Sequence, residues 1–340
     1  MIMRYVCGIV AGCLGFSACT DAAPTAAREP ALSVAASIVP LDRFGIGQGG
    51  RGNACHADEY RQFDFWVGNW NLNPIGSVGS VVSSVLGGCA VLENFFGGAG
   101  RSLNAYDDAT GTWNQFFVSS SGGVLMLRGG FRSDSMILSE QQGPLTDVWT
   151  WTTLPGGSVK QHEQRFLNGA TLPGFVGTYT ARTSPPTFPE PPMTVCARPG
   201  SRQMDFLLGT WDVYEGQAVG GGAAQGRLTV STGAGGCLLE ESLTGHAGFA
   251  GLSYAAFHPQ VQRWFRAYMD TDGRYIRLNG VFDGTRMVMT GNRIGANGAL
   301  VVVRVTWEPN GAGRVVQRWE FSIDGGATFD SEKEYTFVKQ

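Results

Sequence analysis

Short apolar segments separated by glycine-containing turns recur along most of the chain. The runs 124–127 and 275–278 are short and apolar-rich, and each is soon followed by glycine. Residues 287–290, 300–307 and 314–322 follow, and Asn-Gly, Pro-Asn-Gly and Asp-Gly-Gly sequences separate or close them. Such dipeptides and tripeptides are typical of hairpin turns between strands. No amphipathic helical stretch of any length interrupts this pattern, which therefore predicts an all-β protein.

The same pattern occurs twice in the same order. The strings at 63–70 and 204–211 match, and so do the Gly-Gly-Cys sequences at 87–89 and 235–237. Trp113 likewise matches Trp264 further along. The spacing between matching positions grows only slightly toward the C-terminus, as expected when short insertions fall in loops. The chain is therefore predicted to contain two copies of one domain.

Each copy holds enough short strands for a closed up-and-down β-barrel of about eight to ten strands. A closed barrel also removes the exposed strand edges that such a β-rich chain would otherwise present. A proline-rich segment between the copies predicts a stiff linker. We therefore expect a signal peptide at 1–19, a flexible tether at 20–54, a first barrel at 55–183, a linker at 184–195 and a second barrel at 196–340.

The opening motif of each copy resembles that of a known fold. Gly68-x-Trp70 and Gly209-x-Trp211 are similar to the Gly-x-Trp signature of lipocalins and their calycin relatives. The longer string Phe-Asp-Phe-x-x-Gly-x-Trp, with Gly-Gly-Cys-x-x-x-Glu after it, resembles an uncharacterised bacterial family, domain of unknown function 1579. The resemblance implies a lipocalin-like barrel in which the tryptophan packs against a basic residue of the last strand, here Arg182 or Lys339. It implies no established activity.

Composition narrows the possible partners. Only 16% of the residues are charged, 43% are hydrophobic, and glycine occurs 50 times. The formal net charge is −3 and no basic run is present, so we expect no nucleic-acid partner. No apolar stretch after residue 20 approaches the roughly 20 residues of a membrane helix.

The N-terminus predicts export. Arg4 precedes an apolar run, and Ser17-Ala18-Cys19 resembles the lipobox at which bacterial lipoproteins are cleaved and acylated. Cys19 is thus expected to be lipidated, so that a lipid anchor alone attaches the protein to a membrane of the cell envelope, facing the periplasm or the exterior. Ordinary secretion is the alternative.

Four further cysteines follow the repeat. Cys55 and Cys196 each lie eight residues before the start of the opening string, and Cys89 and Cys237 each end a Gly-Gly-Cys sequence. In an exported protein this arrangement favours structural disulfides Cys55–Cys89 and Cys196–Cys237. Metal binding or a redox pair is the alternative, but no Cys-x-x-Cys or companion histidine supports it.

A repeated glutamate suggests a ligand site. Alternation along a strand places Glu93, and Glu241 in the second copy, on one face with apolar neighbours. If these faces point inward, each cavity has an aromatic wall with polar groups, as small-molecule pockets do. The alternative is that the glutamates face water and the tryptophans are core. The candidate ligand-binding residues are Glu93, Trp113, Gln115, Phe117, Glu241, Trp264, Arg266 and Tyr268.

Known catalytic and metal-binding patterns were not found in the sequence. The four histidines share no repeat position and no metal spacing, and there is no nucleophile elbow or phosphate-binding loop. We therefore expect no metal, no cofactor and no identifiable catalytic residue.

The leading hypothesis is a protein that binds or carries a small apolar or amphipathic molecule, with the second barrel the better candidate. Arg266 would then either meet an anionic head group or pair structurally with Glu241. An isomerase- or cyclase-type enzyme using a barrel cavity, and a scaffold with filled barrels, are the alternatives.

Overall fold

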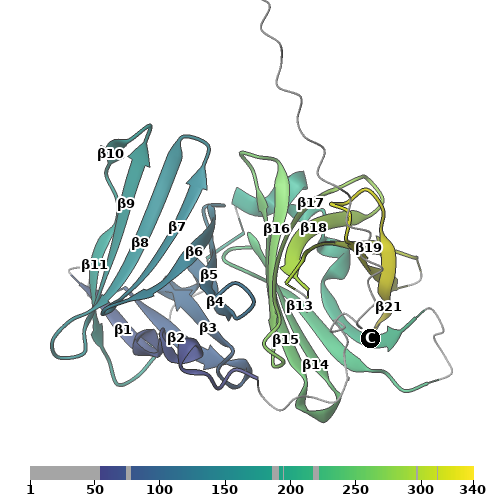
Figure 1. The fold of residues 1–340 in the computed structure, drawn as a ribbon, viewed down its shortest axis with the longest axis horizontal. Coiled ribbons are helices and arrows are strands. Elements are labelled where there is room, and N and C mark those ends of the chain that lie inside the picture. Colours follow the sequence, from purple (N-terminus) through teal and green to yellow (C-terminus); the bar gives the residue numbers. More distant parts are fainter. Residues whose placement is uncertain are drawn as a thin grey trace, which may run out of the picture. The chain divides into compact units, whose positions relative to one another are not determined.

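The computed structural model describes residues 54–73, 78–185, 191–193, 195–216, 222–295, 298–311 and 313–340. These residues belong to one compact unit, Pro40–Gln340. Strands dominate in both copies of the repeat, and the remaining regular elements are short 3-10 helices (Figure 1). The predicted all-β class with two tandem barrels is confirmed.

The first copy forms a closed ring of ten antiparallel strands. Strands β1 to β9 follow one another around the ring, and β11 closes it by pairing with both β9 and β1. Strand β10 (Ala170–Leu172) forms an extra hairpin on β9. The ring strands are β1 (Gly68–Asn73), β2 (Gly79–Val85), β3 (Ala90–Phe95), β4 (Gly100–Asp107), β5 (Thr112–Ser119), β6 (Val124–Arg132), β7 (Ser135–Gln142), β8 (Leu145–Thr153), β9 (Val159–Leu167) and β11 (Val176–Ala181).

The second copy forms a closed barrel of ten strands in simple sequence order, and β12 pairs with β21 to complete it. Because every strand pairs on both sides, no backbone edge is left open in the ring. The strands are β12 (Gly209–Glu215), β13 (Gly226–Gly233), β14 (Leu238–Gly245), β15 (Ala250–His258), β16 (Arg263–Asp270), β17 (Tyr275–Phe282), β18 (Met287–Ile294), β19 (Leu300–Pro309), β20 (Arg314–Ser322) and β21 (Asp330–Lys339).

The Gly-x-Trp motif joins a 3-10 turn to the first strand of each barrel. Trp70 Nε1 donates to the carbonyl of Trp66 at 2.8 Å, and Trp211 Nε1 donates to that of Leu207 at 2.7 Å. Gly209 has a φ of +123°, which L-residues rarely adopt, so glycine permits the sharp entry into β12. The motif therefore locks the preceding turn onto the buried indole.

The expected basic partner of the tryptophan is present in the second barrel. Lys339 Nζ lies 5.3 Å from the centre of the Trp211 ring, a cation–π contact. In the first barrel Arg182 instead donates to Asn71 Oδ1 at 3.1 Å. The two barrels therefore close with different contacts at the end of the last strand.

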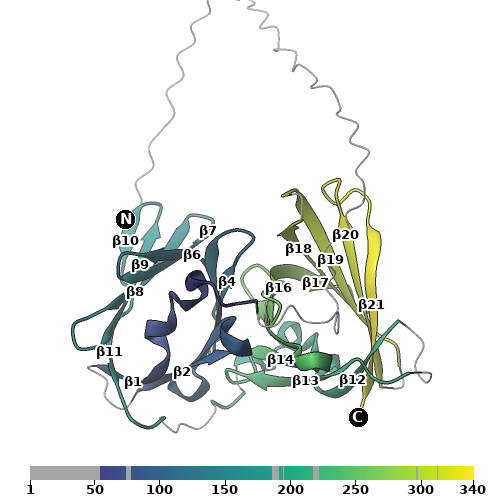
Figure 2. The ribbon, with the colours of Figure 1, turned by 60° about the horizontal axis from the view of Figure 1, so that its bottom comes forward.

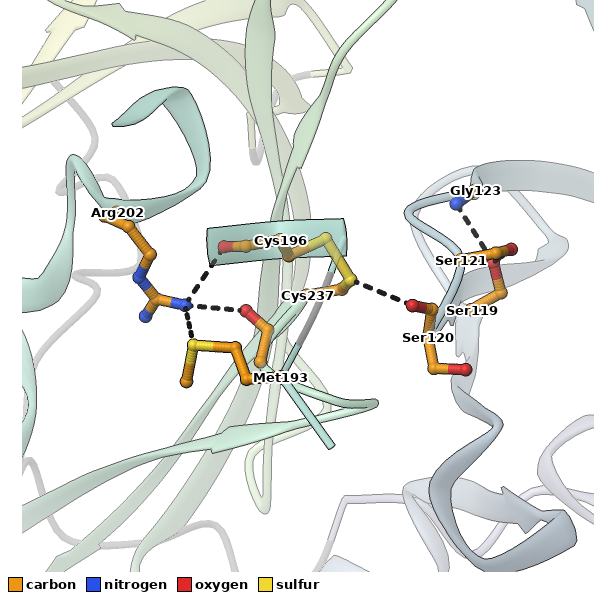
Figure 3. The surroundings of a disulfide bond; sticks show 9 residues. Ser119, Ser120, Ser121, Gly123, Met193, Cys196, Arg202 and Cys237 are labelled. Atoms are coloured by element: carbon orange, nitrogen blue, oxygen red, sulfur yellow. Dashed lines mark hydrogen bonds between the residues drawn. A yellow bond between two sulfur atoms is a disulfide. The ribbon is translucent and has the colours of Figure 1, made fainter. Parts of the chain in front are cut away.

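Both predicted disulfides are formed. Cys55–Cys89 and Cys196–Cys237 each have a Cα–Cα distance of 5.0 Å, and each joins a segment that precedes its barrel to the Gly-Gly-Cys sequence before an early strand. Arg202 reinforces the second link, because its Nη1 donates to the carbonyl of Gly236 at 2.9 Å. The same Nη1 also donates to the carbonyl of Cys196 at 3.4 Å (Figure 3). The segment is therefore held by a covalent bond and a charge-assisted hydrogen bond.

The 3-10 segments close one end of each barrel. The purple turns before β1 lie across the opening of the first barrel (Figure 2), where Phe63 packs edge-on against Trp113 and Trp151 with ring centres 5.6 and 5.5 Å apart. Trp113 Nε1 is close to Gln62 Oε1 at 3.1 Å, and Trp264 Nε1 is bonded to Gln203 Oε1 at 3.0 Å. Trp113 and Trp264 thus form the floor of their barrels.

Two groups of expectations fall outside the described residues. The signal peptide with Cys19, almost all of the 20–54 tether and part of the 184–195 linker are not described. Among the helices that are described, none has the length and apolar character to span a membrane.

Candidate functional site

Each barrel contains a cavity above its tryptophan floor, and the repeated glutamate lies in its wall. In the first barrel the strands β3 and β5 supply Glu93, Gln115 and Phe117. The remaining lining is mostly aromatic and comprises Phe95, Leu125, Trp149, Gln161, Phe175 and Tyr179. Of the two orientations that the sequence left open, the inward one therefore applies to Glu93.

The carboxylate of Glu93 is buried and accepts two hydroxyl hydrogen bonds. Only 4% of the residue is exposed. Ser80 Oγ donates to Oε1 at 2.6 Å, and Ser102 Oγ donates to Oε2 at 3.4 Å. Ser102 is directly across from Glu93 on β4, which explains why its hydroxyl reaches the carboxylate.

A chain of hydrogen bonds supports this arrangement from β5. Gln115 Nε2 donates to Asn104 Oδ1 at 2.8 Å, and Asn104 Nδ2 donates to Ser102 Oγ at 2.9 Å. The Ser102 hydroxyl in turn donates a hydrogen bond to Glu93, so each of these three hydrogen bonds points toward the carboxylate. Gln115 therefore acts on Glu93 only through two intermediates.

The electrostatics of the first cavity disfavour an isolated negative charge. Burial raises the pKa of Glu93, and the hydroxyl groups of Ser80 and Ser102 offset only part of that effect. Burial also raises the pKa of the Tyr179 phenol, as does the nearby Glu93 charge. Among the described residues, none that lines this cavity is a lysine, arginine or histidine.

The second cavity has the same cross-strand pairing around its glutamate but different polar groups. Glu241 pairs across strands with Ser253, which pairs in turn with Tyr268, just as Glu93 pairs with Ser102 and Ser102 with Phe117. Its wall consists of Leu228, Glu241, Leu243, Phe249, Gly251, Leu252, Ser253, Arg266, Tyr268, Asp270, Gln317, Trp319, Tyr335 and Phe337.

In the second cavity the glutamate already has a cation. Arg266 Nε donates to Glu241 Oε1 at 3.2 Å and its Nη2 donates to Oε2 at 2.7 Å, a two-pronged ion pair. The two residues are 3% and 6% exposed. The guanidinium carbon lies 5.4 Å from the ring centre of Tyr268 and 5.3 Å from that of Trp307. Of the two partners that the sequence suggested for Arg266, the structure therefore shows Glu241.

A second acidic group lines the same cavity. Tyr268 donates its hydroxyl proton to Asp270 Oδ2 at 3.1 Å, and Asp270 Oδ1 accepts the backbone N–H groups of Asp272 and Arg274. Burial raises the pKa of Asp270 to about 6, although Arg274 opposes the shift. Asp270 thus titrates closer to neutral pH than an exposed aspartate does.

Neither cavity is filled by side chains. The space that the centres of water-sized molecules can reach is about 80 Å³ in the first barrel and about 50 Å³ in the second. A single buried water needs roughly 10–15 Å³ by this measure, so each cavity has room for several waters. With the open space at the mouth included, the volumes are about 430 and 550 Å³.

The structure divides the predicted ligand residues into two groups. Six of them line the cavities, and Trp113 and Trp264 lie beneath, fully buried in the floors. The six are Glu93, Gln115, Phe117, Glu241, Arg266 and Tyr268. Whether any of them binds a ligand stays a prediction.

Several cavity residues were missed from the sequence. Ser102 and Ser253 are separated by 151 residues, the same spacing as Trp113 and Trp264, so the repeat itself could have found them. Trp149 gives no such signal, because its counterpart in the second copy is a valine. Its Nε1 is buried and has no hydrogen-bond partner among the described residues.

No group of three metal-ligating side chains comes together within the described part of the chain. The chemistry that the cavities offer is therefore that of carboxylates, hydroxyls, amides, one guanidinium and aromatic rings.

The sequence matches no protein-family model and no curated protein. Among solved structures it is similar to a protein of unknown function from the DUF3598 family of Nostoc punctiforme, with 12% identity over 83% of this chain and 99% of that one, at a TM-score of 0.25. It is also similar to a Trp-176-Ala mutant of transferrin binding protein B from Haemophilus parasuis, with 9% identity over 74% of this chain and 61% of that one, at a TM-score of 0.18.

Proposed function

We propose that this protein binds or carries a small apolar or amphipathic molecule in its barrel cavities. One observation carries the proposal: both barrels keep an open cavity with a largely apolar wall and a buried carboxylate at the same position of the repeat. Small-molecule sites combine an apolar wall with a few well-placed polar groups in this way. A scaffold protein would have no need to keep two such cavities open.

The first barrel is the better candidate, although the sequence favoured the second. In the second cavity Arg266 and Glu241 satisfy each other, so a ligand would have to compete with an ion pair at 2.7 Å. Among the described residues, Glu93 in the first cavity has only hydroxyl partners.

The proposal also includes the location of the protein in the cell. Two disulfides suit an oxidising compartment outside the cytoplasm. We propose that the barrels are lipocalin-like domains of the domain of unknown function 1579 type, carried by a lipoprotein that Cys19 anchors in the cell envelope. The Gly-x-Trp motif of each copy and the Ser17-Ala18-Cys19 sequence support this.

Binding is tested with the neutral dye N-phenyl-1-naphthylamine, whose fluorescence rises in apolar surroundings. Leu125→Trp fills the first cavity and Leu243→Trp fills the second, since each leucine lines only one of them. We expect each variant to lose one class of site and the double variant to lose both. Melting curves verify that the variants fold. Absence of dye binding to the wild type, or unchanged binding to the folded double variant, would overturn the proposal.

An enzyme is the second candidate, because Glu93 is an acid shielded from water with a raised pKa inside an open cavity. Native mass spectrometry of protein purified from its own cells would reveal a retained ligand. If that ligand is a substrate, Glu93→Gln should bind it but leave it unconverted. If wild type and variant both leave it unchanged, the enzyme hypothesis is wrong and carriage remains.

A further inference from the structure

The two cavities present the same carboxylate in the same frame but differ at one facing position. Gln115 in β5 corresponds to Arg266 in β16, because each lies two residues before the ring that faces the serine of the neighbouring strand. In the second barrel this position supplies a guanidinium to Glu241. In the first barrel it supplies an uncharged amide, which is turned toward Asn104.

The second barrel therefore shows which kind of group this arrangement of side chains can hold beside the glutamate. Its glutamate holds a planar cation, and Tyr268 and Trp307 lie 5.4 and 5.3 Å from the centre of that cation. A carboxylate on one side and aromatic faces on the others are the two elements that stabilise an organic cation away from water.

The first barrel contains both elements without the cation. Glu93 is 4% exposed and its lining neighbours carry no positive charge. The cavity wall includes the rings of Phe95, Phe117 and Trp149, and Phe175 is stacked on Trp149 with ring centres 6.0 Å apart. An anionic ligand would face a buried carboxylate here, and a cationic one would neutralise it.

Gly100, the first residue of β4, leaves space for two aromatic rings of the cavity wall. A Cβ on Gly100 would lie 2.7 Å from the ring of Phe117 and 3.4 Å from that of Phe95. Gly251 has the same role in the second barrel, where a Cβ would lie 2.7 Å from the Tyr268 hydroxyl. The glycine thus makes room for aromatic rings over the site in both copies.

Charges further along the same strands favour a cation as well. Asp147 lies two residues before Trp149 on β8, and Glu163 two residues after Gln161 on β9, so each shares a strand face with a lining residue. One guanidinium, Arg165, serves both carboxylates, at 2.9 and 3.6 Å. The group therefore keeps a net negative charge, which raises the local concentration of cations.

We propose that the cavity of the first barrel binds the ammonium head group of an amphipathic amine, with Glu93 as its counter-ion and the aromatic wall around it. This deepens the proposed function and depends on it, since a ligand must enter the first barrel at all. It assigns to the ligand the place that the Arg266 side chain occupies in the second barrel.

Three octyl compounds test the proposal by titration calorimetry on the full chain: octyltrimethylammonium, neutral 1-octanol and anionic octyl sulfate. We expect the ammonium compound to bind at least ten-fold more tightly than octanol, and octyl sulfate to bind more weakly than octanol. In Glu93→Gln, affinity for the ammonium compound should fall about ten-fold or more, and affinity for octanol should change less than three-fold.

Gln115→Arg is the second variant, because it places the cation of the second barrel into the first. It should abolish ammonium binding there without lowering the melting temperature. Equal affinities of the wild type for octanol and the ammonium compound, or tighter binding of octyl sulfate, would refute the ammonium proposal and leave the binding function standing. Failure of all three compounds to bind would refute both the ammonium proposal and the proposed binding function. Full retention of ammonium binding in both folded variants would also refute the role of Glu93.

Discussion

Replacing Arg266 by methionine isolates the energetic role of the buried ion pair in the second barrel. Methionine keeps much of the aliphatic stem but removes the guanidinium. Glu241 would then remain 6% exposed and would lose the two hydrogen bonds at 3.2 and 2.7 Å that neutralise it. A buried carboxylate without a cation is far less stable than the pair.

The expected loss of stability follows from leaving the buried carboxylate without its cation. Breaking a buried pair by removing one partner typically costs about 3–5 kcal/mol. A domain of this size changes its melting temperature by about 4 °C per kcal/mol, so the second barrel should melt about 12–20 °C lower. Replacing both partners, as Arg266→Met with Glu241→Leu, removes the buried charge as well. The double variant should therefore be close to the wild type in stability.

The assay is thermal unfolding followed by circular dichroism and calorimetry, with dye binding measured on the same samples. Gln115→Met is the matched control, because it changes the corresponding position of the first barrel where no ion pair exists. We expect that control to shift the melting temperature by only a few degrees.

A shift below about 4 °C in Arg266→Met would refute this reasoning, since it would mean that the pair contributes less than about 1 kcal/mol. If dye binding to the second barrel fell at the same time, Arg266 would instead act on the ligand, as the sequence-based hypothesis had it. A double variant as unstable as the single one would show that packing, not the stranded charge, causes the loss.

Three further outcomes are expected. The two disulfides close loops with sequence separations of 34 and 41 residues, so each should stabilise the fold by about 4 kcal/mol in the chain-entropy model. Cys55→Ala with Cys89→Ala should therefore lower the unfolding free energy by about 4 kcal/mol in urea titrations. Non-reducing peptide maps of this variant should show the Cys196–Cys237 disulfide unchanged. Burial raises the folded-state pKa of Glu93 above 4.5, so the folded protein keeps this carboxyl protonated to a higher pH than the unfolded chain does, and wild-type stability falls as pH rises between the two pKa values. Glu93→Gln should therefore be more stable than wild type at pH 7 and should lose that advantage below pH 4.5. An advantage that stays constant from pH 4 to 8 would contradict the raised pKa of Glu93. Cys19→Ala should release the protein from the membrane fraction or leave it uncleaved, and unchanged fractionation and processing would exclude the lipid anchor.

The repeat, the strand-rich fold and the disulfide pairing could be predicted from sequence because each depends on local order. Alternation has a period of two, so Glu93 and Phe95 must share a face wherever the strand goes. Cys55 and Cys89 could be paired because the repeat offers one early cysteine and one Gly-Gly-Cys cysteine in each copy. Such patterns depend only on the order of residues in the chain, and they can be recognised without knowing which strands become neighbours.

The partners of the cavity residues depended on tertiary structure. Ser102 reaches Glu93 because β3 and β4 pair in one register, and a shift of one residue would have turned that hydroxyl to the outer face. Gln115 and Arg266 occupy matching positions of the repeat, yet Gln115 donates to Asn104 and Arg266 donates to Glu241. Strand pairing and its register decide which charges meet inside each barrel, because Glu241 and Arg266 come together only when β14, β15 and β16 pair side by side.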